Sequence, residues 1–509
     1  MNKYIGIYIA ILYFILQSFL ALGAGMSWDE PQNFFNGTKT LRFFQTGDRR
    51  YVDSWGDTAL FAGDHMTYMA VDANYPPGAA LIGAVFSTIL SDSLHIVDWI
   101  DGFHIGEIAI GSVGVGTFYY LGVFLGLTPS ISLATTVLFA LYPTIFGQMR
   151  ADAKDIPMMS ALIIFVYAFL RFIKNEKLWW GIVAFVVLGV ATWMKPTAPI
   201  ILVPAIILAR KKLIFLPLFL AISVGVFYAL WPYVWSDPVG KLGAASEFFR
   251  TIGLRNAVLY FGKFYQAGID LPWHYPWVIL AIQTPVEIIV LAFVGIVAAW
   301  KKKHVFIILW FILGMARFVL PGFVIYAKIR HFIDVMPAFF LLVGFGLQGM
   351  RQQKLRGAFI LIVLAHVLWI DVTFYPYEPS YFNFLVGGTK RVAVKQLFDV
   401  EHWGTATASA MQFINSQKGE VTVYGCRLNH LARLYARPQV KIVAVPRVGS
   451  YVLVPNMPSE FVDALSFYKK HQTLVYTVKR AEADLFYVYT IDNPGTFICG
   501  GEVATGENV

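Results

Sequence analysis

The sequence predicts a polytopic α-helical membrane protein with about 11–13 spans, followed by a small extracytoplasmic α/β domain. Three observations carry this prediction. The chain is 57% hydrophobic and only 14% charged, and its apolar residues form blocks of roughly 17 to 25, the length that crosses a bilayer as a helix. After about residue 374 the hydropathy falls, and helix and strand patterns alternate.

Short clusters of Lys and Arg separate the apolar blocks, and cytoplasmic loops carry this bias. The net charge of +9 therefore indicates membrane topology, and no nucleic-acid partner is expected. The first apolar run is long for the core of a secretory signal, so we expect it to be an uncleaved span. The basic clusters, expected on the cytoplasmic side, are Lys3, 171–177, 210–212, 301–304 and 351–356.

An odd number of crossings from a cytoplasmic N-terminus places the C-terminus outside the inner (cytoplasmic) membrane. A crossing at the apolar segment 76–93 would break this alternation, so we expect an interfacial or re-entrant helix there. The alternative is a full crossing that is compensated by fusion of two later blocks. The expected spans lie near 4–25, 105–126, 130–148, 157–174, 178–194, 197–210, 213–232, 277–300, 305–322, 331–349 and 357–374.

These boundaries divide the chain into two domains. Residues 1–374 form the transmembrane domain, whose outer loops 26–75, 149–156 and 233–276 hold unusual polar segments, and residues 375–509 form the α/β domain. In the second domain we expect helices at 405–417 and 459–470 and strands at 420–425, 473–478 and 484–491.

The two cysteines, Cys426 and Cys499, have no zinc-ligand spacing. Both fall in the extracytoplasmic domain, where a disulfide is permitted. We favour two buried free thiols over that disulfide, because Cys499 lies in a Gly-flanked tail, and chain ends of this kind are often poorly ordered.

Two adjacent carboxylates, Asp29 and Glu30, directly follow the first span, beside the interfacial anchor Trp28. At that depth a carboxylate can take a proton from an acceptor hydroxyl, and its neighbour can hold a divalent cation. Asp155 in "KDIP" is interpreted either as a helix start, with Pro157 in the first turn, or as a functional acid, and both can hold. The candidate catalytic residues are Asp29, Glu30 and Asp155, and the candidate ligands of Mg²⁺ or Mn²⁺ are Glu30 and Asp155.

Cationic groups gather at the same expected face. The segment "KIRH" carries three of them in four residues, against the positive-inside bias, which indicates a bound anion such as phosphate. No Walker loop, GxSxG elbow or HExxH motif occurs in a suitable context, so energy must arrive with the substrate or from a gradient. The candidate phosphate ligands are Arg330, His331, Lys195 and Lys154.

The aromatic segment "PWHYPW" brings Trp273, His274 and Tyr275 to the expected outer face. Aromatic residues at a membrane interface are ordinarily anchors. Their rings can also contact a sugar or an isoprenoid chain, so these three residues are candidate substrate contacts.

The order of these motifs resembles the C-type membrane glycosyltransferases, specifically glycosyltransferase family 39, the protein O-mannosyltransferase-like group. The resemblance rests on the Asp-Glu pair after the first span, a Pro-Pro segment, "KDIP", "KPT", "WSDP", "PWHYPW" and "IRHF", and on the tail stretch 377–404. It implies an inverting transfer of a sugar from a polyprenyl-phosphate donor to an acceptor hydroxyl or amine on the outer side of the membrane.

Carried over by position, the resemblance implies that Asp29 is the catalytic base and Glu30 its companion. Asp155 matches the acid of the second outer loop, and Arg330 with His331 matches the basic loop near the donor phosphate. The β-trefoil module of the eukaryotic members is absent from the sequence, so the acceptor, whether lipid, glycan or protein, stays open.

A transporter or flippase of lipid-linked glycans is the rival interpretation. Such a protein would place charges along a path through the membrane. The clearest charges within the expected spans are Glu107, Glu287 and Asp334, whereas most polar motifs lie at one face. This distribution favours chemistry over transport.

Overall fold

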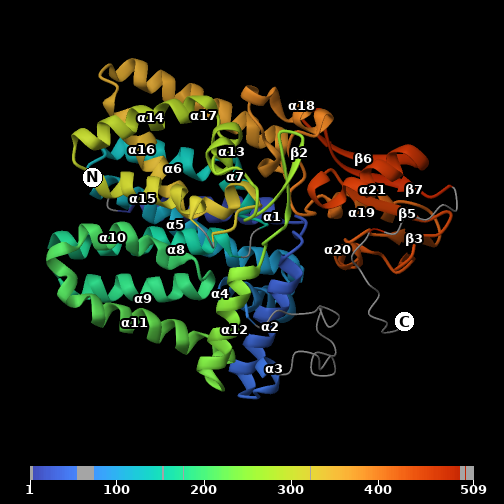
Figure 1. The fold of residues 1–509 in the computed structure, drawn as a ribbon, viewed down its shortest axis with the longest axis horizontal. Helices are drawn as coiled ribbons and strands as arrows, with labels where there is room; N and C mark the ends of the chain where they lie inside the picture. Colours follow the sequence, from blue (N-terminus) through green and yellow to red (C-terminus); the bar gives the residue numbers. More distant parts are fainter. Residues whose placement is uncertain are drawn as a thin grey trace.

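The computed structural model describes residues 4–53, 74–151, 154–175, 177–320, 323–492 and 499. Lys3 and the 54–73 part of the first expected outer loop lie outside these residues. Up to residue 374 the described chain is a helical bundle, whose long helices run side by side in Figure 1. A sheet domain lies beyond one end of the bundle, which we call the domain-facing end.

Each expected span coincides with one or more helices, because each apolar block is long enough for several helical turns. Five stretches have the length and composition of complete spans: Trp99–Phe124, Asp155–Lys174, Lys212–Leu230, Lys328–Gly349 and Gln353–Phe374. The predicted multi-pass helical class is confirmed. The main elements of the bundle are α1 (Ile5–Ala21), α5 (Trp99–Phe124), α8 (Asp155–Asn175), α9 (Leu178–Met194), η3 (Ala198–Ile201), α10 (Leu202–Leu208), η4 (Arg210–Phe215), α11 (Leu216–Leu230), α15 (Val305–Ala316), α16 (Met336–Gly349) and α17 (Gln353–Phe374).

Two of the expected spans are each divided by a proline. Pro143 and Pro285 interrupt the blocks 130–148 and 277–300. Proline fits the beginning of a helix, but in the interior it removes an N–H donor and clashes with the preceding turn. Each block therefore forms two helices, which are α6 (Pro129–Ala140) with α7 (Pro143–Gln148) and α13 (Tyr275–Gln283) with α14 (Val286–Lys301).

Glycines let neighbouring helices of the bundle approach closely. A Cβ atom on Gly116 of α5 would overlap the carbonyl oxygen of Gly6 in α1, and one on Gly346 of α16 would overlap the carbonyl oxygen of Leu291 in α14. Small residues of this kind allow the van der Waals packing that associates helices in an apolar solvent.

Short elements cover the domain-facing end of the bundle. Helices α2 and α12 lie across the ends of the long helices in Figure 1. These elements are α2 (Glu30–Thr46), α3 (Arg50–Asp53), α4 (Gly78–Ser87) with its π-helical continuation (Thr88–Ser93), η5 (Pro232–Trp235), α12 (Pro238–Thr251), the antiparallel hairpin β1 (Ala257–Tyr260) and β2 (Lys263–Gln266), η6 (Arg317–Val319) and η7 (Lys328–Val335).

The segment 76–93 packs beside the beginning of α5. Gly83 of α4 leaves room for the Phe103 ring of α5. The same end of α5 meets the chain after α1, where the Gly23 N–H donates to Asp101 (3.0 Å). The packing is compatible with both expectations for this segment, and its relation to the bilayer stays a prediction.

The C-terminal domain is α/β, as expected. Its five strands follow the order β4-β3-β5-β7-β6, in which β3 is parallel to β4 and β5, and β7 is antiparallel to β5 and β6. Strands β4 and β5 are additions to the sequence prediction. The elements after the bundle are η8 (Glu378–Ser380), η9 (Phe384–Val386), α18 (Gly388–Lys395), α19 (Thr407–Asn415), β3 (Val421–Tyr424), α20 (Asn429–Tyr435), β4 (Val440–Ile442), β5 (Tyr451–Pro455), α21 (Pro458–His471), β6 (Thr473–Arg480) and β7 (Ala483–Thr490).

The two cysteines form a disulfide, so the prediction of free thiols is wrong. The Cα atoms of Cys426 and Cys499 are 5.4 Å apart. Cys426 lies two residues after the end of β3, and the Cys499 N–H donates to the hydroxyl of Tyr424, the last residue of that strand (3.1 Å). The tail is thus held against the sheet at this point, whereas the flanking glycines had indicated a loose end.

Candidate active site

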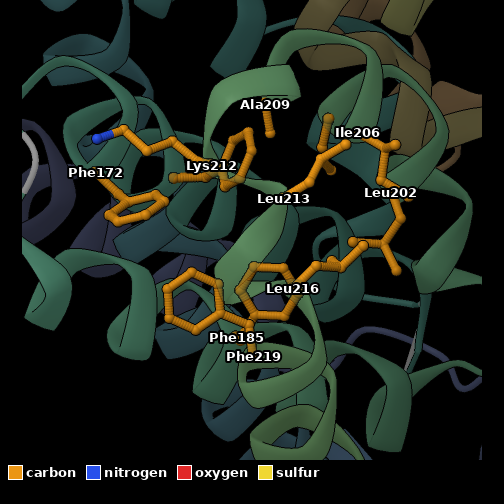
Figure 2. A pocket seen from close by; sticks show the side chains of 11 residues that line it. Phe172, Phe185, Leu202, Ile206, Ala209, Lys212, Leu213, Leu216 and Phe219 are labelled. Carbon is orange, nitrogen blue, oxygen red and sulfur yellow. The ribbon is translucent and has the colours of Figure 1, made fainter.

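Two cavities differ in the chemical groups that they offer. The pocket in Figure 2 lies between α8, α9, α10 and α11, and Phe172, Phe185 and Phe219 are among its lining residues. Among the described residues that line it, Lys212 alone is charged, so this pocket brings no acid and base together. A second cavity of about 500 Å³ lies at the domain-facing end. We call it the charged cavity, and its lining includes Asp29, Tyr75, Lys154, Lys195, Arg317, Tyr326, Arg330, His331 and Trp403.

Arg330 joins two carboxylates from distant parts of the chain. Its Nη2 donates to Asp29 Oδ2 (2.7 Å) and its Nε donates to Asp155 Oδ2 (2.8 Å). Lys195 Nζ donates to the other oxygen of Asp155, and Lys154 Nζ lies 4.0 Å from Asp29 Oδ2. Among the described residues, this cluster has one more cation than carboxylates, a balance that attracts anions.

The ends of helices bring these side chains to one place. Asp29 immediately precedes α2, and Lys195 immediately follows α9. Asp155 begins α8, as one interpretation of "KDIP" predicted, and its carboxylate also belongs to the ion-pair cluster. Arg330 lies in η7, which continues directly into α16.

The two carboxylates of the cluster have different environments. The Asp155 side chain is 1% exposed and both its oxygens are paired with cations. The Asp29 side chain is 32% exposed, and both of its ion pairs use Oδ2, which leaves Oδ1 outside them. Burial would raise the pKa of Asp29, but Arg330 and Lys154 outweigh it and hold that pKa below its usual value. Asp29 is therefore ionised at neutral pH.

Aromatic rings contact the cations of the cavity. Lys154 Nζ lies 4.2 Å from the centre of the Tyr75 ring, and the Arg330 guanidinium lies 5.0 Å from the Trp403 ring. Such cation–π contacts hold a charged group while leaving its donors for other partners. Burial raises the pKa of Tyr326 to about 12, so its hydroxyl remains protonated near neutral pH.

Glu30, expected as a companion of Asp29, faces away from the charged cavity. Its carboxylate accepts the Ser27 N–H and lies 3.1 Å from His104 Nε2, and it is 1% exposed. This arrangement satisfies a backbone donor at the beginning of α2, which is a common structural use of an acidic residue in the first turn. The structure therefore separates Glu30 from Asp29.

The predicted phosphate ligand His331 and the three predicted substrate contacts are divided between the cavity and its surroundings. His331 lines the cavity, where its Nδ1–H donates to the Val324 carbonyl oxygen (3.2 Å). Trp273, His274 and Tyr275 are not among the described lining residues. Of these, Trp273 is exposed, His274 bonds a tyrosine hydroxyl of the β1–β2 hairpin, and Tyr275 is buried at the beginning of α13.

The predicted divalent-cation ligands, Glu30 and Asp155, do not fit a shared ion. Glu30 bonds the groups described above, and both oxygens of Asp155 pair with protein cations. Mg²⁺ and Mn²⁺ sites gather oxygen ligands around one point. In the described part of the chain, no group of three His, Cys, Asp or Glu residues is arranged in this way.

Sequence reasoning did not single out Trp403, Tyr326 or Arg317 as residues of the site. Trp403 lies in the C-terminal domain, so nothing in the linear order indicates its contact with Arg330. Arg317 pairs with Asp334 (2.7 Å between Nη2 and Oδ1) at the end of α15. A charged residue inside an apolar block was the available signal for Arg317, because such residues need a partner.

Comparison with known proteins supports the fold. Residues 74–235 match the family model described as dolichyl-phosphate-mannose-protein mannosyltransferase. The structure of ArnT from Cupriavidus metallidurans in the apo state is 13% identical, with a TM-score of 0.51 over 95% of this chain and 97% of that one. The structure of the same protein bound to undecaprenyl phosphate is 14% identical, with a TM-score of 0.51 over 96% and 98%. Among the curated proteins compared, none matches the sequence.

The two similarities agree with the order of the sequence motifs. The family match covers the Pro-Pro segment, "KDIP", "KPT" and the end of α11, and the structural likeness extends over nearly the whole chain. The resemblance is therefore confirmed in fold: the chain is a multi-pass membrane protein that shares the fold of ArnT, and its residues 74–235 match the mannosyltransferase family model.

Proposed function

We propose that the protein transfers a sugar from a polyprenyl-phosphate-linked donor to an acceptor hydroxyl at the outer face of the membrane, with inversion at the anomeric carbon. One observation carries the proposal: a partly exposed carboxylate, Asp29, shares a cavity with the cations Arg330, Lys195 and Lys154. The family match and the likeness to an ArnT structure that holds undecaprenyl phosphate support a donor of this class.

The cations suit the phosphate of the donor. When the sugar leaves, negative charge grows on the phosphate oxygens, and fixed positive groups in a water-poor site stabilise that charge. Arg330 offers a planar fork and Lys195 a compact ammonium, which are the two usual forms of phosphate recognition. Their positions are fixed by Asp155, so little reorganisation is needed when the donor arrives.

An apolar groove next to the charged cavity suits the lipid part of the donor. The groove has a volume of about 280 Å³ and lies between α10 and α15, where Val203, Leu313 and Leu320 line it. Arg317 lines both the groove and the charged cavity. A polyprenyl phosphate laid along this path would keep its chain among apolar side chains and its head among cations.

Asp29 is placed to act as the base. The acceptor O–H proton passes to the Asp29 carboxylate, the acceptor oxygen forms a bond to the anomeric carbon, and the bond from that carbon to the phosphate oxygen breaks. The polyprenyl phosphate leaves with the bonding electrons. A single displacement from the face opposite the phosphate inverts the configuration, and the aromatic residues Tyr75, Phe249 and Trp403 offer flat surfaces to the sugar.

The test is a donor-consumption assay with purified protein in lipid nanodiscs. A panel of synthetic polyprenyl-phosphate hexoses and pentoses is incubated with the wild type, and release of the free polyprenyl phosphate is followed by mass spectrometry. We expect release that depends on Asp29, with the Asp237→Asn variant as a matched control, because Asp237 caps α12 through its bond to the Gly240 N–H (3.0 Å).

The same preparation distinguishes the rival function. A flippase moves the lipid-linked sugar between leaflets and leaves the bond from sugar to phosphate intact. Transbilayer movement in proteoliposomes without cleavage of any donor in the panel would contradict the transferase proposal.

A further inference from the structure

The segment that leads from α1 to Asp29 is held by the C-terminal domain. The Met26 N–H donates to the Tyr435 hydroxyl (2.7 Å), and the Trp28 N–H donates to the Trp403 carbonyl oxygen (2.7 Å). His430 Nε2 lies 3.3 Å from the Trp28 carbonyl oxygen, to which it donates as the N–H tautomer. Three backbone groups of Met26 and Trp28, close before Asp29, thus find their partners in a different domain.

Side chains tighten the same contact. The Arg427 guanidinium lies 5.3 Å from the Trp28 ring, and it also forms an ion pair with Glu460 (2.6 Å). A Cβ atom on Gly25 would lie 2.6 Å from the Thr405 carbonyl oxygen, so the backbone of this segment is seated directly against the C-terminal domain. Glycine is needed there for the close approach.

The turn that carries Trp403 is itself fixed within the C-terminal domain. The Glu401 carboxylate accepts the N–H groups of Gly404 (2.7 Å) and Ala406 (3.1 Å). Trp403 therefore has a defined place, from which its carbonyl oxygen holds Trp28 and its ring contacts Arg330. The turn that carries Trp403 therefore contacts both the segment before Asp29, the proposed base, and Arg330, the proposed phosphate ligand.

We propose that Trp403, Arg427, His430 and Tyr435 form a clamp that sets the position of Asp29 in the charged cavity. These four are positioning residues, because they act on Asp29 through the backbone of the preceding segment. A base works only within hydrogen-bond reach of the proton that it removes, and a displacement of about 1 Å can cost about 100-fold in rate. The C-terminal domain is then a structural part of the site, and transfer depends on its docking.

Two variants test the clamp without touching Arg330. Tyr435→Phe removes the hydroxyl that accepts the Met26 N–H, and His430→Leu removes the donor to the Trp28 carbonyl oxygen. His430→Gln is the conservative partner, since an amide N–H can donate over a similar reach. Tyr377→Phe is the matched control, because its hydroxyl bonds Ser409 (2.6 Å), which lies outside the four residues of the clamp and the segment 25–29.

The first measurement, amide hydrogen exchange by mass spectrometry, requires no catalytic activity. In the full-length protein, we expect a peptide that covers residues 24–35 to exchange about tenfold faster in Tyr435→Phe and His430→Leu than in the wild type, Tyr377→Phe or His430→Gln. The exchange rate of a peptide from strand β5 reports on the integrity of the C-terminal domain, and it should be the same in all five proteins. Equal exchange of the 24–35 peptide in all five proteins would overturn the clamp.

The second measurement is kinetic and rests on the proposed function. We expect kcat to fall about 10-fold to 100-fold in His430→Leu, with recovery in His430→Gln and an unchanged KM for the donor, because the phosphate ligands are held by other segments. Faster exchange without a loss of kcat would refute the positioning role. Absence of turnover in the wild type would refute the proposed function, and the exchange result would still decide whether the clamp holds the segment.

Discussion

Replacing Asp29 by Asn changes one carboxylate oxygen to an amide nitrogen in a side chain that is 32% exposed. The amide cannot accept a proton near neutral pH, so the variant lacks the proposed base while its size and shape are kept. Positioned general bases contribute about 10²-fold to 10⁴-fold to a rate. We therefore expect kcat to fall by at least about 100-fold.

The fold should tolerate this substitution. In the ion pairs of Asp29 with Arg330 (2.7 Å) and Lys154 (4.0 Å) the carboxylate is 32% exposed, so solvent screens its charge, and the amide of Asn can still accept a hydrogen bond from Arg330. Arg330 also keeps its bond to Asp155 (2.8 Å), and Lys154 keeps its contact with the Tyr75 ring (4.2 Å). The expected thermal midpoint of Asp29→Asn is within a few degrees of the wild-type value.

The assay compares release of polyprenyl phosphate by wild type, Asp29→Asn and Asp237→Asn at equal amounts of folded protein. Asp237→Asn makes the same chemical change at the first position before α12, where Asn caps nearly as well as Asp. Turnover by Asp29→Asn within about threefold of the wild type, with saturating donor, would refute the assignment of Asp29 as the base.

Four further outcomes are expected. Arg330→Lys keeps one charge but loses the fork between two carboxylates, so the KM for the donor should rise by about tenfold or more in the same assay. Glu30→Ala leaves two buried partners unbonded and should lower the free energy of unfolding by about 2–4 kcal/mol, measured by denaturation in detergent, with a similar kcat per folded molecule. The pKa of Asp29 lies below its usual 3.8, so the carboxylate is ionised at any pH above that value. The pH profile of kcat/KM should therefore show no fall due to Asp29 between pH 8 and 5. A fall near pH 6 that is absent from the profile of Asp29→Asn would contradict this expectation. Thiol labelling of denatured, unreduced protein should find no reactive Cys426 or Cys499, whereas reduction should expose both.

The fold class was accessible from the sequence because a bilayer imposes a simple length rule. Apolar blocks of about 20 residues become helices in lipid, where every backbone group must be satisfied internally. The details depend on local chemistry that overrides this rule, as where Pro143 and Pro285 each divide a block into two helices. The place of the segment 76–93 depends on packing against α5, which hydropathy does not report.

The site was partly accessible, because the residues with the right chemistry follow or begin spans at one expected face. Asp29, Asp155, Lys195 and Arg330 were chosen for this reason, and the structure brings them into one cluster. Glu30 was chosen because it stands next to Asp29 in the chain. Neighbouring residues at the beginning of a helix point in different directions, and the structure turns Glu30 toward His104.

Contacts between domains were beyond the sequence for a physical reason. The hydroxyl of Tyr435 meets the N–H of Met26 across 409 positions of the chain, and no periodicity or spacing connects residues so far apart. The same holds for the Trp403 ring over Arg330. The pairing of Cys426 with Cys499 was misjudged because flanking glycines describe the local backbone and do not report a distant strand that receives it.

Burial gives two residues of the same type different environments in the ion-pair cluster. Asp155 has both oxygens engaged and almost no contact with solvent, so its negative charge is fixed and serves to hold Lys195 and Arg330 in place. Asp29 keeps one oxygen outside its ion pairs and faces the cavity, so it can exchange a proton with a substrate. Pairs of carboxylates whose environments differ in this way commonly divide catalytic work between them. Asp155 would then act through the cations that it orients, while Asp29 acts on the acceptor.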